Sequence, residues 1–157
     1  MSIKGKFIFP SGAERIITEA SNTKITAHFT IGELANNSAP EAVKFILNKK
    51  VLIHADMLEQ LRMRYGKPLV VNSWYRTASY NKRVGGISTS NHLKGTATDL
   101  KVACDDKLWE SFVSNWKLIC AAHGVAGEII RYDTFIHVGS QISYAKDFRI
   151  YDKRNKK

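Results

Sequence analysis

Cysteine and long apolar runs are both scarce in this chain of 157 residues. The two cysteines, Cys104 and Cys120, are spaced like neither a redox pair nor a zinc-binding pair, which excludes a disulfide framework. Two small buried thiols are the favoured interpretation, and a single bridge is the alternative. No stretch is long and apolar enough for a secretion signal or a bilayer span, so we expect a soluble chain made in the cytoplasm.

Internal repeats, low-complexity segments and a glycine-rich phosphate-binding loop are also missing from the sequence. Hydrophobic residues nevertheless make up 44% of the chain and aromatic residues 10%, which excludes a disordered or fibrous protein. A single domain of this length buries about two thirds of the surface that its unfolded chain exposes. We therefore expect one core.

Acidic residues are in deficit, because 14 aspartates and glutamates stand against 24 lysines and arginines, and the net charge is +10. This charge favours a polyanionic partner, whether nucleic acid, an acidic wall polymer or an anionic lipid surface. No nucleic-acid recognition motif accompanies it, so we expect no specific nucleic-acid partner. Several of the basic residues lie in segment 146–157, which we predict to be a solvated tail.

Hydrophobic periodicity and capping residues predict an α+β fold. Residues 1–28 alternate without a helical period, which indicates strands or an extended arm, whereas Thr30 and Glu33 have the spacing of a capping box. Helices are predicted at 31–36, at 40–66 with an interruption near 49–53, at 77–83 and at 106–122. Strands are predicted at 69–71, 97–102, 128–132 and 135–138.

The last two predicted strands are joined by Asp133 and Thr134 and have the pattern of a hairpin. We therefore predict a small antiparallel sheet that carries the functional residues and packs against helices mostly from the N-terminal half. The predicted division is an arm at 1–28, a domain at 29–145 and a basic tail at 146–157.

Three residues are candidates for binding a metal ion. His92 lies in a loop and Asp99 begins a strand, and Gly95 permits the tight turn that would bring them together. His137 lies between the apolar residues Ile136 and Val138, so strand alternation turns it away from the core. Taken singly, each is more often an ordinary surface residue, and their weight comes from the combination.

The sequence resembles the zinc D-alanyl-D-alanine carboxypeptidases and phage cell-wall peptidases, which share a core with the hedgehog signalling domain. The family pattern is S-x-H-x-x-G-x-A-x-D followed by a late H-V. The residues that fit it are Ser90, His92, Gly95, Ala97, Asp99 and His137. Ser73 to Arg76 with Tyr80 and Asn81 is similar to a second family block, and Phe29 to Leu34 is similar to its opening.

The resemblance implies that His92, Asp99 and His137 hold one zinc ion and leave a fourth position for water, which zinc brings towards a pKa of about 7. It also implies that Arg76 clamps a carboxylate or carbonyl of a wall peptide and that Ser90 lies in the substrate site. For Arg76 the alternative is a structural ion pair with an acidic residue.

The general base differs from the family pattern, because Thr134 stands where relatives often place an acidic residue. Asp133 is the favoured candidate and Glu128 the competitor. Pairing Tyr132 with Phe135 sets Ile130 opposite His137 and puts Glu128 diagonally from it on the same face, roughly 7 Å away. Gly139 is a second departure, since relatives commonly carry an acidic residue or serine there.

The leading hypothesis is a zinc peptidase that cleaves peptidoglycan peptides containing D-amino acids, as a carboxypeptidase or an endolysin-type endopeptidase. We expect it to be encoded by a phage or prophage and to act at the bacterial cell wall or in a virion. The alternative is a catalytically weak or inactive zinc-containing module that binds the wall or builds the virion. The sequence does not indicate an oligomeric state.

Overall fold

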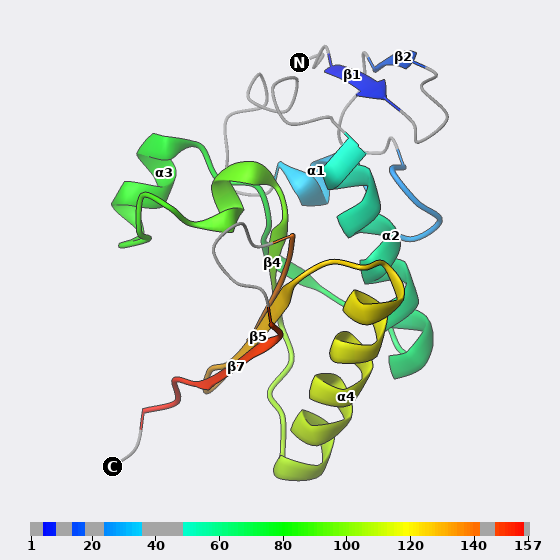
Figure 1. Ribbon diagram of the computed structural model, residues 1–157. Coiled ribbons are helices and arrows are strands. Elements are labelled where there is room, and N and C mark those ends of the chain that lie inside the picture. The colour runs from blue at the N-terminus through cyan, green and yellow to red at the C-terminus, as the bar shows by residue number, and fades with distance from the viewer. Residues whose placement is uncertain (1–4, 9–13, 18–23, 36–48, 142–146, 156–157) are drawn as a thin grey trace.

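A five-stranded sheet with helices on one face forms the centre of the molecule. The computed structural model describes residues 5–8, 14–17, 24–35, 49–141 and 147–155. The strands are β3 (Val71–Ser73), β4 (Ala97–Leu100), β5 (Gly127–Arg131), β6 (Ile136–Ser140) and β7 (Arg149–Asp152). Their order is β3-β4-β6-β5-β7, and all neighbours are antiparallel except β5 and β7. Helices α2 (Lys49–Tyr65) and α4 (Asp106–Ala122) lie on one side of this sheet (Figure 1), which confirms the α+β fold class.

The smaller N-terminal elements agree with the sequence pattern. Strand β1 (Gly5–Ile8) pairs antiparallel with β2 (Glu14–Ile17), inside the segment predicted to contain strands or an arm. Helix α1 (Ile31–Leu34) begins after Thr30, whose hydroxyl accepts a hydrogen bond from the Glu33 amide while the Glu33 carboxylate accepts one from the Thr30 amide. The predicted capping box is therefore confirmed.

Helix α2 is continuous, so the predicted interruption near 49–53 is wrong. Val51, Ala55 and Leu58 are fully buried on one side of this helix, and this apolar stripe carries it through the segment. The earlier part of the prediction, 40–48, lies outside the described residues.

Two further helices begin within one residue of their predicted starts. The Asp105 carboxylate accepts a hydrogen bond from the Leu108 amide at 2.7 Å, at the start of α4. Thr77 caps α3 (Ala78–Arg83) in the same way. The predicted strand at 69–71 is displaced to Val71–Ser73, because β3 is an edge strand of the sheet and leaves the side chain of Val70 exposed.

The predicted solvated tail is wrong for 149–152, because these residues form β7. This strand pairs in parallel with β5, with Arg149 beside Glu128 and Tyr151 beside Ile130. The main sheet therefore runs past residue 145, where we place the end of the domain from the sequence. A parallel edge strand pairs with residues distant in sequence, so no local pattern announces it.

Both cysteines are free, so they form no bridge with each other, and the prediction of buried thiols holds for Cys120. Cys120 is buried on α4 under β5, and burial raises the pKa of its thiol to about 12. Cys104 is only half-buried.

Two buried tryptophans fix the backbone around the candidate metal ligands. The indole N–H of Trp74 donates to the Gly95 carbonyl at 2.7 Å, and that of Trp116 donates to the Gly139 carbonyl at 3.0 Å. His54 of α2 packs against both rings, with centroid distances of 5.7 and 6.0 Å. These contacts tie the loop before β4 and the end of β6 to the core.

Candidate metal centre

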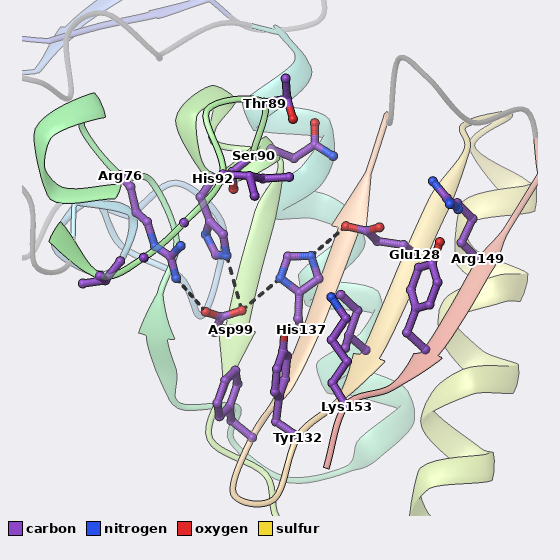
Figure 2. A pocket seen from close by; sticks show the side chains of 18 residues that line it. Arg76, Thr89, Ser90, His92, Asp99, Glu128, Tyr132, His137, Arg149 and Lys153 are labelled. Carbon is purple, nitrogen blue, oxygen red and sulfur yellow. Dashed lines mark hydrogen bonds and ion pairs between the residues drawn. The ribbon is translucent and has the colours of Figure 1, made fainter. Parts of the chain in front are cut away.

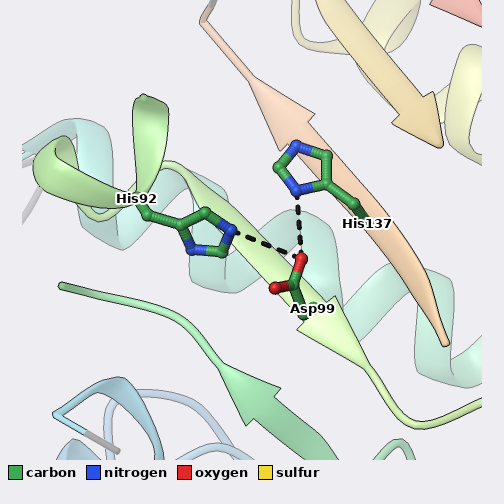
Figure 3. Close-up of side chains that lie close together, drawn as sticks. All are labelled: His92, Asp99 and His137. Atoms are coloured by element: carbon green, nitrogen blue, oxygen red, sulfur yellow. Dashed lines mark hydrogen bonds and ion pairs between the residues drawn. The ribbon is translucent and has the colours of Figure 1, made fainter. Parts of the chain in front are cut away.

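His92, Asp99 and His137 meet on the sheet face opposite α2 and α4. One potential ligand atom from each lies within 4.8 Å of the others. His92 Nε2 is 3.3 Å from Asp99 Oδ1, and His137 Nδ1 is 3.0 Å from the same oxygen (Figure 3). The three side chains come from three different segments, so the cluster is a product of the fold and not of sequence proximity alone.

Local structure explains how each side chain arrives. Asp99 of β4 pairs directly with His137 of β6, so both side chains point to the same face. His92 belongs to the short 3-10 helix η2 (Asn91–Lys94), which is capped by Ser90 at its start and by Gly95 at its end. The φ of Gly95 is 73°. This left-handed residue turns the chain straight from η2 into β4.

Each of the three side chains also has a partner on its far side. His92 Nδ1 lies 2.6 Å from the Trp74 carbonyl, so this nitrogen carries the proton and Nε2 is left to face Asp99. His137 Nε2 lies 2.9 Å from Glu128 Oε1, which leaves Nδ1 on the side of Asp99. Supporting contacts of this kind orient metal ligands in proteins.

The charges of the cluster are strongly coupled. Burial alone would raise the pKa of Asp99, but hydrogen bonds from His137 and His92 hold it far below its usual range. Burial alone would lower the pKa of His137, but its bonds to Asp99 and Glu128 raise it to about 9. Burial lowers the pKa of His92, and Asp99 opposes this only in part. The carboxylate of Asp99 is therefore anionic at neutral pH.

The cluster lies in a cavity of about 490 Å³. One wall is formed by the loop from Val84 to His92, and the floor is formed by side chains of β4, β5, β6 and β7 (Figure 2). Ser90 lines this cavity, and its hydroxyl oxygen accepts a hydrogen bond from the His92 amide. The arrangement has the concave shape and convergent polar groups of a ligand site.

Arg76 also lines the cavity, and all three nitrogens of its guanidinium donate hydrogen bonds to protein oxygens. Nη2 donates to Asp99 Oδ2 at 3.1 Å, Nε donates to Ser73 Oγ at 3.1 Å, and Nη1 donates to Asn81 Oδ1 at 3.3 Å. Both interpretations of Arg76 from the sequence thus have a basis, since it forms an ion pair with an acidic residue and faces the pocket.

The two candidate bases are placed very differently. Glu128 lines the cavity and touches His137, whereas Asp133 is exposed at the hairpin turn, where its carboxylate accepts a hydrogen bond from the Asn155 amide. The structure confirms the register that we predict for the hairpin, with Ile130 opposite His137.

Gly139 explains how Glu128 reaches His137. Gly139 of β6 lies directly opposite Glu128 of β5. A Cβ atom at position 139 would lie 3.1 Å from Glu128 Cγ and 3.3 Å from its Oε1. The absent side chain leaves the space through which the carboxylate passes. Glycine at position 139, where the sequence departs from the family pattern, therefore makes room for the side chain of Glu128.

Strand β7 and the residue that follows it contribute pocket residues that we do not predict from the sequence. Arg149, Tyr151 and Lys153 all line the cavity. The only local signal for a strand was the apolar pair Phe148 and Ile150 at period two, which the surrounding charges obscured.

Comparison with known proteins gives a match to a family model. A family model described as peptidase M15 matches residues 27–139, which is more than half of the chain and includes the three clustered side chains. A search of curated proteins gives no match. Among the helices that the structure describes, none is long and apolar enough to cross a membrane.

Proposed function

Because the chain belongs to the peptidase M15 family, we propose that it is a zinc-dependent peptidase that hydrolyses peptidoglycan peptides at bonds involving D-amino acids. The observation that carries this proposal is the meeting of His92, Asp99 and His137 at the floor of an open pocket. A peptidase of this family needs a peptide substrate, and the cavity lies directly over the cluster.

The donor set fits zinc. Two imidazole nitrogens and one carboxylate oxygen are a common protein ligand set for catalytic zinc, and each ligand here has a supporting partner. Zinc held by His92, Asp99 and His137 would polarise a peptide carbonyl and bring the pKa of bound water to about 7. Arg76 holds Asp99 in place through Oδ2, so we assign it a positioning role towards this ligand.

We assign proton acceptance to Glu128 in preference to Asp133. Of the described acidic residues, Asp99 and Glu128 line the cavity, and both oxygens of Asp99 are bonded to Arg76 and the two histidines. Oε1 of Glu128 is hydrogen-bonded to His137. We propose that Oε2 accepts a proton from the attacking water and passes it to the leaving amine. The Ser90 hydroxyl still has its own proton to donate to a substrate carbonyl.

The test is the release of new amino groups from purified peptidoglycan. We expect the wild-type protein to release them, to stop when a chelator is added and to recover with zinc. His92→Ala should lose the activity, and His28→Gln, which replaces an exposed histidine outside the site, should keep it. Mass spectrometry of the products separates a carboxypeptidase, which releases single terminal residues, from an endopeptidase, which cuts inside the peptide.

One observation favours a second function, a zinc-containing module that binds the wall or a virion without cutting. The imidazole of His137 lies between Glu128 and Asp99, so Glu128 also has the position of a supporting group (Figure 2). Zinc binding without release of amines, together with retention on peptidoglycan, is the result that this second function predicts.

We further propose that the protein acts at the bacterial cell wall and comes from a phage or prophage. The support is the family and the charge of +10, which suits binding to an acidic wall polymer.

A further inference from the structure

The sheet carries one continuous row of side chains from the metal cluster to its far edge. Asp99 pairs with His137, His137 with Ile130, and Ile130 with Tyr151, so these four residues lie side by side on β4, β6, β5 and β7. Because strand residues alternate between the two faces, Arg149 lies on the same face as Tyr151, and Lys153 follows directly after the last residue of β7. Figure 2 shows both on the same side of the sheet as Glu128 and His137.

The aromatic ring of Tyr151 organises the two cations. The Arg149 guanidinium lies 5.2 Å from the ring centroid, and the Lys153 ammonium lies 5.8 Å from it. Cations at these distances are attracted to the face of an aromatic ring. Both charges are therefore held at one end of the cavity.

The charge of the cavity is unbalanced towards an anion. Arg76, Arg149 and Lys153 bring three positive charges, whereas the acidic groups of the lining, Asp99 and Glu128, are bonded to the histidines and to Arg76. Burial alone would raise the pKa of Glu128, but His137 lowers it, and Arg149 and Lys153 add to the lowering. The two cations of β7 therefore act on the interior of the pocket.

Arg76 is less suited to hold a substrate carboxylate than its sequence block implies. Its three nitrogens each donate to a protein oxygen, and one of these oxygens belongs to Asp99. Turning the fork towards a ligand would break the contact that orients Asp99.

We propose that Arg149 and Lys153 bind a carboxylate of the substrate peptide, so that the site selects peptides with a free carboxyl group near the cut bond. This inference rests on the proposed peptidase function, which supplies the bond that is cut. Adjacent strands lie about 4.8 Å apart, so two strand steps from His137 to Tyr151 span about 10 Å. An extended peptide advances about 3.3 Å per residue, which places the carboxylate within about three residues of that bond.

The test compares muropeptides, released from peptidoglycan by a muramidase, with the same muropeptides after their carboxyl groups are converted to amides. Binding is measured by calorimetry with a metal chelator present, so that turnover does not occur. The wild-type protein should bind the acid form about tenfold or more tightly than the amide form, because a charged donor recognises a carboxylate best. Equal binding of the two forms would overturn the proposal.

Variants tie the preference to β7. The double variant Arg149→Gln/Lys153→Gln should lose the preference for the acid form, and Lys153→Gln alone, at an exposed position, should reduce it without a risk to folding. Arg149→Lys, which keeps the charge, should retain most of it. Lys117→Gln, on the exposed side of α4, is the control with unchanged preference. A preference that survives in the double variant would assign it to other residues.

The same preparations, assayed without chelator for released amines, test the peptidase function separately. A protein that prefers the acid form but releases no amines contradicts the proposed function and supports the β7 site. A protein that releases amines from both forms and binds both equally supports the proposed function and contradicts the β7 site.

Discussion

His137 is the residue on which the chemistry of the site converges, because it has a carboxylate at each nitrogen. Asp99 lies at Nδ1 and Glu128 at Nε2, at 3.0 and 2.9 Å. The contact with Glu128 fixes which nitrogen faces the cluster. The same carboxylate is our candidate for proton acceptance, so orientation and proton transfer must be separated by experiment.

Glu128→Gln separates these two roles. The glutamine oxygen can still accept a hydrogen bond from Nε2, so zinc should stay bound, whereas the loss of the base should lower kcat by about 100-fold or more. Glu128→Ala removes both roles and should in addition weaken zinc binding by about 10- to 100-fold. Steady-state kinetics and a competition titration with a chelating dye measure these effects. A Gln variant with wild-type kcat would show that Glu128 only positions His137.

Gly139→Ala tests the space that Glu128 occupies. The added Cβ would approach Glu128 Cγ to 3.1 Å and its Oε1 to 3.3 Å, so the Glu128 side chain must shift by a few tenths of an ångström from its position beside His137. We expect kcat/KM to fall by about tenfold, as for other losses of a contact behind a metal ligand, while the protein stays folded. Unaltered kinetics would mean that the position of Glu128 does not depend on Gly139.

At the scale of elements, His54 joins α2 to the two strands that carry Asp99 and His137. Its ring nitrogens lie 2.7 Å from the Ser140 hydroxyl of β6 and 2.9 Å from the Thr98 hydroxyl of β4. Burial lowers the pKa of His54 to about 3, and the charges of His137 and His92 add to this. The helix is therefore anchored by a neutral imidazole.

This anchor predicts a loss of stability in acid. An unfolded histidine titrates near pH 6.5, so between about pH 6.5 and 3 the unfolded chain binds a proton at His54 that the folded protein does not. The free energy of unfolding should then fall by about 1.4 kcal/mol for each pH unit of acidification from this residue. Urea unfolding at pH 7 and 4.5 measures this fall in the free energy of unfolding.

In His54→Gln the dependence on pH should be shallower by this amount, whereas Lys117→Gln, at an exposed position of α4, is the control with an unchanged dependence. If the free energy of unfolding depends on pH equally in His54→Gln and in the wild-type protein, His54 is not the source of this dependence.

The elements that could be predicted are those whose signals are local. The cap at Thr30, the helix at 106–122 and the hairpin around Asp133 follow from neighbouring residues and are found where we predict them. Strand β7 could not be predicted, because its pairing with β5 joins segments that are distant in sequence, and its charges resemble a solvated tail.

The same distinction holds for the site. The register of the hairpin put Glu128 near His137, which the structure confirms. The contact of Arg76 with Asp99 depends on side-chain direction between separate segments, so spacing alone could not reveal it.

At the scale of the whole molecule, the sheet separates support from chemistry. Helices α2 and α4 cover one face (Figure 1), and the other face carries the cluster and the basic end of the pocket. The net charge of +10 favours an acidic partner, and salt should weaken binding to peptidoglycan. Co-sedimentation with peptidoglycan at 50 mM and about 500 mM salt measures this, and binding that is independent of salt would contradict a role for the charge.

The most direct test of the account is the position of zinc in crystals grown with one equivalent of the metal, located by anomalous diffraction at the zinc edge. We predict a single strong peak bonded to His92 Nε2, a carboxylate oxygen of Asp99 and His137 Nδ1. A peak elsewhere, or no peak at these three residues, would contradict the account.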